Sequence, residues 1–317
     1  MRKRYLSLFL FSLFSITSCN QSFPFELKDT VYNVYGTYVS VSLYEGSNEN
    51  ISDIKELIRK YDILSDSYQE RELTNVYTIN HTNEEVTVSN ELYEMLQTSF
   101  DDMSNAENYN PLMGSLNEKW KEALRNKEVL SETVINEELN KINNSTFSFN
   151  GNNKVQREGE ATIDLGGIAK GYLLDKVKDY LVSKEIKKYM IDAGRSSILL
   201  GEKENGEEFV ISISDLNHKR IRLKNSVIST SGISEQHVTI GDKTYSHIVN
   251  PHTGSAIAQY DAIIVINDNA SLGDALATSL MNNTIEEIQV VESSLNVKVI
   301  VVKDGEVLYK NENITLF

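Results

Sequence analysis

The chain has 317 residues, of which 40% are hydrophobic and 24% are charged, as is ordinary for a folded globular protein. Its formal net charge of −15 argues against DNA or RNA as a partner, because an acidic body repels the phosphate backbone. The length fits one large domain or two modest ones. With only 3 prolines, long disordered linkers are not expected.

The first 18 residues have the pattern of an export signal. Arg2, Lys3 and Arg4 form a positive start, and residues 6–16 are apolar apart from serines. This pattern is typical of a secretory signal peptide, and the apolar run is too short for a comfortable membrane span. Small residues then lead to position 19, where cleavage is expected.

Cys19 is the only cysteine, so no internal disulfide can form. Residues 16–19 resemble a bacterial lipobox, in which the thiol is acylated and becomes the new N-terminus. The alternative is a plain signal peptide with an incidental cysteine, but the lone cysteine lies where lipidation needs it. We expect a signal peptide over 1–18, a tether over 19–30, and an exported protein with a lipid anchor on the periplasmic or extracellular face of a bacterial membrane.

After the tether, a strand region and several helices are predicted. Residues 31–43 are rich in β-branched and aromatic side chains, which favours one bent strand or a pair of strands around Gly36. Apolar residues at helical spacing predict an amphipathic helix over 51–65. Further helices are expected over 90–104, around Trp120 and over 131–143, and then a polar, turn-like stretch over 146–159.

In the second half of the chain, strands and helices are mixed. A strand over 161–165 should lead through Gly166 and Gly167 into a helix over 168–183. The other expected elements are strands over 189–192, 197–200, 208–214, 220–229, 245–249 and 262–267, helices over 271–281 and 285–294, and a hairpin over 297–310. This mixture predicts an α+β fold with a mixed, largely antiparallel sheet, in one domain over 31–317.

The segment 164–171 is the strongest candidate for chemistry. Asp164 ends the expected strand, Gly166 and Gly167 let the backbone approach a ligand, and a helix begins at once. The free N–H groups and dipole at a helix start favour a phosphate, and Lys170 can add a positive charge. The alternative is a tight structural turn with a solvated lysine.

A second candidate is the helix over 271–281. Asp274 and Thr278 are four residues apart, so their oxygens lie on one helix face. Carboxylate and hydroxyl oxygens suit Mg²⁺, which also binds substrate phosphates. The alternative is an acid that offsets the helix dipole beside a packed threonine. His247, near a strand end, could act as a base or line a ligand pocket, although a lone histidine is more often structural.

Together and in chain order, these segments resemble the ApbE family of FAD:protein FMN transferases. The similar segments are 35–37, 64–65 with Glu72, Leu73 and Asn80, 109–116 with Trp120, 164–171, 191–194, 230–232, 246–248 with Pro251 and 253–254, and 274–278. The match runs over about 31–310. The chain departs from the family pattern at four positions, where Tyr35, Asn110, Leu112 and Arg195 replace methionine, aspartate, threonine and glycine.

The resemblance implies a set of site residues. The carbonyl of Gly167, together with Asp274 and Thr278, would hold Mg²⁺. The residues expected around FAD are Tyr35, Tyr109, Asn110, Asp164, Lys170, His247 and Ile248. Asp274 would act through the metal, and His247 would orient or deprotonate the attacking hydroxyl.

The resemblance also implies a reaction, in which FMN passes from FAD to a threonine or serine of an exported or membrane flavoprotein and AMP leaves. With water as acceptor, the same site would hydrolyse FAD. Two rival readings are a lipid-anchored flavin-binding protein without turnover and a solute-binding lipoprotein. A binding protein needs no metal, and a solute receptor normally has two α/β lobes, so both fit the sequence less well.

Overall fold

The computed structural model describes residues 26–203, 205–234 and 237–317. The predicted signal peptide and the lipidation site at Cys19 lie outside these residues. Residues 27–30, expected in the tether, belong to the first strand. No helix in the described ranges combines the length and apolar character needed to cross a membrane.

Eight strands of the described residues form one sheet in which every neighbouring pair is antiparallel. In spatial order they are β1 (Leu27–Val34), β2 (Thr37–Leu43), β6 (Tyr189–Ala193), β7 (Ser197–Leu200), β10 (Ser226–Gly232), β13 (Ala262–Asn267), β14 (Lys298–Lys303) and β15 (Glu306–Lys310). The predicted α+β class with a largely antiparallel sheet is therefore confirmed, and β1 and β2 are a hairpin rather than one bent strand.

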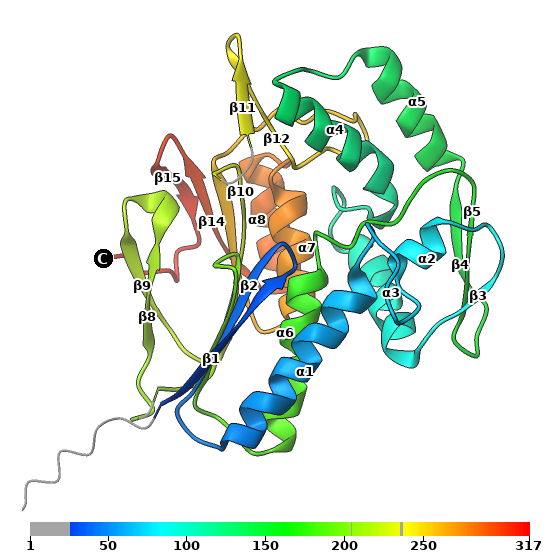
Figure 1. Cartoon of the computed structure of the whole chain (residues 1–317). Coiled ribbons are helices and arrows are strands. Elements are labelled where there is room, and N and C mark those ends of the chain that lie inside the picture. The colour runs from blue at the N-terminus through cyan, green and yellow to red at the C-terminus, as the bar shows by residue number, and fades with distance from the viewer. Residues whose placement is uncertain (1–25, 204, 235–236) are drawn as a thin grey trace, which may run out of the picture.

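Helices cover one face of this sheet (Figure 1). They include α1 (Asn48–Ser65), α6 (Ala169–Ser183), α7 (Ala270–Leu280) and α8 (Ile285–Leu295). α7 packs directly on β10 and β13, and α6 lies between α7 and α1. The apolar spacing predicted these helices because each buries one stripe of side chains against the sheet.

A short hairpin covers the opposite face of the sheet. It consists of β8 (Phe209–Ile213) and β9 (Lys219–Leu223), and it shares a second apolar cluster with Ile228, Ile264 and Ile300 of the sheet. β13 is therefore covered on both faces, which explains why five consecutive residues of this strand are buried. The predicted strand over 220–229 is in fact two strands, β9 and β10.

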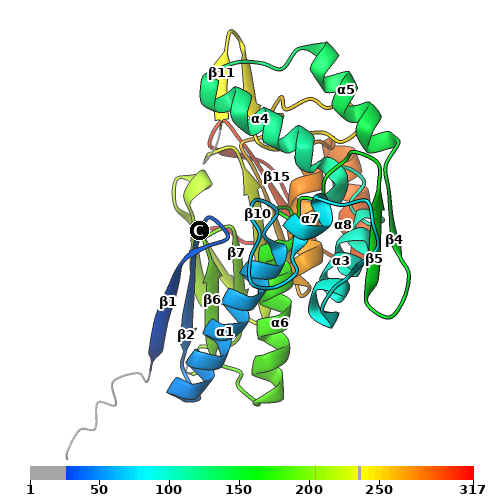
Figure 2. The same cartoon turned by 45° about the vertical axis from the view of Figure 1, so that its right-hand side comes forward.

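A third layer lies beyond the helices (Figure 2). It contains α2 (Val76–Asn80), α3 (Asn90–Met103), α4 (Gly114–Asn126), α5 (Glu132–Asn143) and a small sheet of β3 (Val86–Thr87), β5 (Lys154–Glu158) and β4 (Thr146–Phe149). The prediction of a turn-like stretch over 146–159 was wrong. Phe147 and Phe149 of β4 pack on Phe100 of α3, so tertiary contacts stabilise a hairpin with a weak local pattern.

A two-stranded hairpin stands beside α4. It is formed by β11 (His237–Ile240) and β12 (Lys243–Ser246), and Tyr245 stacks on Trp120 with ring centroids 5.9 Å apart. The strand predicted over 245–249 therefore ends at Ser246. The chain leaves this hairpin directly into the segment that carries His247.

Candidate functional site

A cavity of about 490 Å³ opens where α6, α7, the β6–β7 turn and the segment after β12 meet. Most of the predicted site residues line it, although they come from distant parts of the chain. They are Tyr109, Asn110, Asp164, Gly167, Lys170, His247, Ile248, Asp274 and Thr278. Tyr35 is the one predicted residue of the described chain that does not line it.

The segment 161–165 leads into this cavity, but the strand predicted there is absent. Instead, side chains hold the extended backbone together with the backbone of Pro111 and Gly114. The Asn80 carboxamide accepts a hydrogen bond from Ile163 N at 2.7 Å and donates one to Ile163 O at 2.8 Å. Buried Arg157 donates to the carbonyls of Ala161 and Thr82. These bonds replace a neighbouring strand, because buried backbone groups must find partners.

Asp164 shapes the turn that follows. Its Oδ1 accepts a hydrogen bond from Gly166 N at 2.8 Å, and its Oδ2 lies 3.6 Å from Lys121 Nζ. Gly167 has little space for a side chain, because a Cβ there would lie 2.8 Å from Cε2 of Tyr109. The second glycine is therefore required by packing against a ring that itself lines the cavity.

Asp274 is a buried carboxylate of the cavity wall. It is 8% exposed, and its Oδ1 accepts hydrogen bonds from the hydroxyls of Ser197 and Ser229 at 2.8 and 2.6 Å. Its Oδ2 accepts from Gly171 N of α6 at 2.7 Å. Burial raises the pKa of this carboxyl to about 6, against the opposing effect of the Lys170 charge and the hydrogen bonds.

These residues fit a hard cation such as Mg²⁺. Thr278 lies one turn after Asp274 on α7. Its hydroxyl is close to Gly167, since a Cβ added to this glycine would lie 3.5 Å from the hydroxyl oxygen. The described chain has no group of three or more His, Cys, Asp or Glu residues that could hold a metal. A cation here would therefore rely on hydroxyl, carbonyl and substrate oxygens, which is the usual situation for Mg²⁺.

His247 and Ile248 also line the cavity, in a loop that is fixed at several points. Ser246 Oγ accepts from Ile248 N at 3.2 Å, and Asn250 Oδ1 accepts from the backbone of His252 and Thr253. Trp120 Nε1 donates to Gly254 O at 2.9 Å. Because Trp120 of α4 binds this loop, a helix that is distant in sequence helps to hold His247 at the cavity wall.

Two of the predicted FAD-binding residues also have structural roles. Tyr109 is buried, its hydroxyl lies 2.7 Å from Ser99 Oγ, and burial raises its pKa well above the ordinary value. Asn110 Oδ1 accepts from Leu112 N at 2.9 Å and so caps a short 3₁₀ helix, Pro111–Met113. Each of these side chains both shapes the cavity and lines it.

The structure places Tyr35 in the β1–β2 turn, outside the set of residues that line the cavity. Its backbone N donates to Asp62 Oδ1 of α1 at 2.6 Å, which fixes the turn over that helix. Tyr35 has a φ of +52° and Gly36 has a φ of +69°, so both residues lie in the left-handed region. Tyr35 therefore does not line this cavity, and its place around the ligand stays a prediction.

Several lining residues were not predicted as site residues. They are Asn117, Lys121, Arg195, Ser197, Thr230, Ser231 and Asp215. Serines in apolar strands were the available signal, because Ser197 and Ser229 are almost fully buried on β7 and β10. Their partner, Asp274, lies far away in sequence, so no local pattern reveals the contact.

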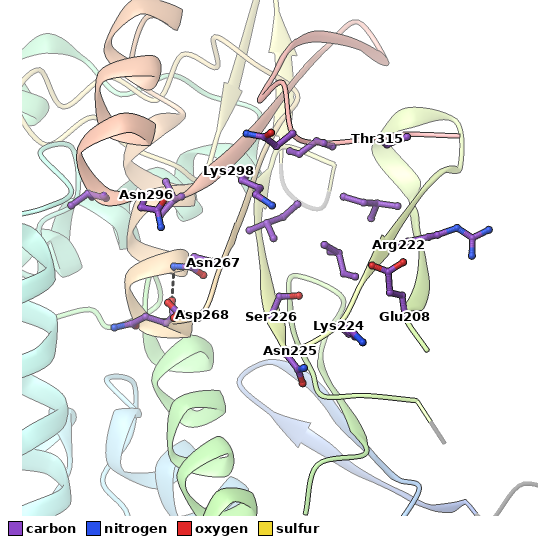
Figure 3. Close-up of a pocket in the computed structure, with 18 of the residues that line it drawn as sticks. Glu208, Arg222, Lys224, Asn225, Ser226, Asn267, Asp268, Asn296, Lys298 and Thr315 are labelled. Carbon is purple, nitrogen blue, oxygen red and sulfur yellow. Dashed lines mark hydrogen bonds between the residues drawn. The ribbon is translucent and has the colours of Figure 1, made fainter. Parts of the chain in front are cut away.

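A second cavity, of about 720 Å³, lies beneath the β8–β9 hairpin near the end of the chain (Figure 3). Its wall carries charges of both signs, among them Glu208, Arg222, Lys224, Asp268 and Lys298. Of the predicted site residues that the structure describes, none lines this cavity. The chemistry expected from the sequence therefore belongs to the first cavity.

The chain folds into an antiparallel sheet with a helical layer, and its cavity contains a buried carboxylate, a lysine and a histidine. These features define an α+β protein with an enzyme-like site. The chain belongs to the ApbE family, whose model matches residues 35–301. It is 26% identical to a Klebsiella pneumoniae protein named FAD:protein FMN transferase, over 264 residues that cover 80% of this chain and 81% of that one.

Solved structures show the same fold. The crystal structure of the ApbE protein of Thermotoga maritima superposes with a TM-score of 0.78 at 25% identity, covering 90% of this chain and 96% of that chain. The flavin transferase ApbE of Vibrio cholerae gives a TM-score of 0.71 at 20% identity, with 92% and 97% covered. At that lower identity, the likeness concerns the fold alone.

Proposed function

We propose that this chain is an FAD:protein FMN transferase, which moves FMN from FAD to a threonine or serine hydroxyl of another protein and releases AMP. Family membership supports the transferase activity, and the chain is an enzyme of this class. The observation that carries the proposal is the pairing of Asp274 and Thr278 with Gly167 and Lys170 in one cavity.

The residues of α6 and α7 would bind the pyrophosphate of FAD. Lys170, in the first turn of α6, adds a positive charge where the helix start already favours an anion. The hydroxyls of Ser197 and Ser229 and the N–H of Gly171 hold the Asp274 carboxylate in one orientation. Asp274, Thr278 and the Gly167 carbonyl would hold Mg²⁺, which when bound neutralises phosphate charge and polarises the phosphorus under attack.

The transfer itself is a direct displacement. The acceptor hydroxyl oxygen forms a bond to the FMN phosphorus, the bond from that phosphorus to the bridging oxygen breaks, and AMP leaves. His247 would orient the hydroxyl and accept its proton. Positioning and charge neutralisation are sufficient for this chemistry, so the enzyme itself need not carry FMN covalently.

Two alternatives remain within the same site: hydrolysis of FAD by water, and binding of FAD without turnover. The deciding experiment incubates the protein with FAD, Mg²⁺ and a candidate acceptor and then reads intact masses. A gain of FMN mass on the acceptor, lost when its threonine is replaced by alanine, supports transfer. Free FMN alone means hydrolysis, and intact FAD means binding only.

We also propose that the enzyme works outside the cytoplasm, attached to a membrane through Cys19. The positive start, apolar run and lone cysteine of the first 19 residues support this. The acceptor would then be an exported or membrane protein, because a tethered enzyme meets substrates near the membrane at raised effective concentration.

A further inference from the structure

The turn between β6 and β7 carries an arginine in a backbone conformation that favours glycine. Arg195 has a φ of +65°, in the left-handed region that disfavours a side chain. The preceding residue, Gly194, has a φ of +67° and no space, since a Cβ would lie 2.5 Å from Cγ2 of Thr37. Strain retained at a cavity wall points to a use for the side chain.

This turn and α6 bind different oxygens of Asp274. Two residues after Arg195, the Ser197 hydroxyl binds Asp274 Oδ1, whereas the α6 backbone binds Oδ2 through Gly171 N. Arg195 and Lys170, in the first turn of α6, both line the cavity that Asp274 lines. A pyrophosphate held near Asp274 would therefore have one cation from the turn and one from the helix within the same cavity.

The Arg195 side chain is exposed and lines the cavity. Among the described residues, no carboxylate forms an ion pair with its guanidinium. Its backbone N donates to Asp192 Oδ1 at 2.7 Å, which fixes the turn. Lys121, another cation of this cavity, is by contrast paired with Asp164 at 3.6 Å. The guanidinium is thus available to an incoming anion.

We propose that Arg195 binds the pyrophosphate of the dinucleotide substrate together with Lys170, a role that rests on the proposed function. A guanidinium presents parallel N–H donors that match phosphate oxygens, and such charge-assisted bonds are strong. Because the family pattern has glycine at this position, the contact would be a property of this chain and would tighten its hold on the phosphates.

The test compares Arg195→Gly with Lys127→Gly by calorimetric titration of FAD, with inorganic pyrophosphate as a competitor. Lys127 is an exposed cation outside the cavity with a φ of +58°, so both variants remove a positive charge and a strained side chain. Both should keep a thermal midpoint at or above that of the wild type. Only Arg195→Gly should weaken FAD and pyrophosphate binding, by about 10- to 100-fold. Arg195→Lys should retain part of the affinity.

Unchanged FAD affinity in Arg195→Gly would overturn the assignment. Weaker FAD binding with unchanged competition by pyrophosphate would also overturn it, since the contact would then be with another part of FAD. A wild-type protein that neither binds FAD nor transfers FMN would instead refute the proposed function, so the two failures are distinguishable.

Discussion

At the scale of single residues, Asp274 has the central role in the site. It is a buried carboxylate on which two strands and the start of α6 converge through hydrogen bonds. Replacing it with alanine would leave those donors unsatisfied, at a cost of about 1–3 kcal/mol each. Activity lost in that variant could therefore reflect misfolding rather than chemistry.

Asp274→Asn is the sharper variant, because it keeps the shape and an acceptor oxygen while removing the negative charge. We expect AMP release from FAD to fall by about 100-fold or more, since the proposed Mg²⁺ site would lose its carboxylate ligand. The thermal midpoint should stay close to that of the wild type. Activity is measured across a Mg²⁺ titration, and wild-type rates at limiting Mg²⁺ would remove Asp274 from the metal site.

Gly167 supplies a second prediction at this scale. In Gly167→Ala, the new methyl group would lie 2.8 Å from the ring of Tyr109, which is buried and tied to Ser99. We expect a loss of about 1–3 kcal/mol in the free energy of unfolding. Gly166→Ala is the control, because its methyl group meets only the end of the Asp164 side chain, at 3.0 Å. Equal destabilisation of both variants in urea unfolding would contradict this packing argument.

At the scale of elements, the start of α7 is held by an acid of α6 and packs near a buried acid of α3. Asp175 of α6 accepts hydrogen bonds from the backbone N of Ala270 and Ser271, each at 2.8 Å. Asp102 of α3 is 7% exposed, and burial together with the nearby Asp175 charge raises its pKa to about 6. The folded state therefore binds the Asp102 proton more tightly than the unfolded state, whose ordinary pKa is 3.8.

It follows that the Asp102 contribution to stability is largest below about pH 4 and is lost as the pH rises towards 6. At about 1.4 kcal/mol per pKa unit, the loss is about 2–3 kcal/mol. Asp102→Asn should remove this part of the pH dependence. The free energy of unfolding of the variant should therefore rise relative to that of the wild type between pH 4 and pH 7. Urea unfolding at both pH values measures it. The exposed neighbour, as Asp101→Asn, should retain most of the wild-type difference, because its charge is the smallest of the causes that raise the Asp102 pKa. An equal effect of the two variants would refute the argument.

At the scale of the whole molecule, the described residues form one sheet and its covering layers, and the proposed anchor precedes them. We predict that Cys19→Ala releases the protein from the membrane fraction or leaves the signal peptide uncut. The physical reason is that acyl chains on the thiol supply about 0.8 kcal/mol per buried CH₂, and without them the acidic body has little affinity for anionic lipid. Fractionation and intact mass of protein from a bacterial host provide the measurement. A mature protein with an unmodified Cys19 would contradict the prediction.

Much of the fold could be predicted from local sequence, because periodicity records which face of an element is buried. The helix over 51–65 and the hairpin turning at Asp304 and Gly305 are examples, found as α1 and as β14–β15. So is the one-turn spacing of Asp274 and Thr278, which depends only on helix geometry. These features depend on residues that are neighbours in the chain, so local sequence was enough to predict them.

Other features were decided only by the tertiary structure. The segment 161–165 is extended without being a strand, because Asn80 supplies hydrogen bonds to the backbone of Ile163 from far along the chain. Phe147 and Phe149 form a strand because α3 offers Phe100 as a packing partner. The same holds for the serines around Asp274 and for Arg195 on the cavity wall. In each case the deciding energy is a contact between residues distant in sequence, and local spacing carries no record of such a contact.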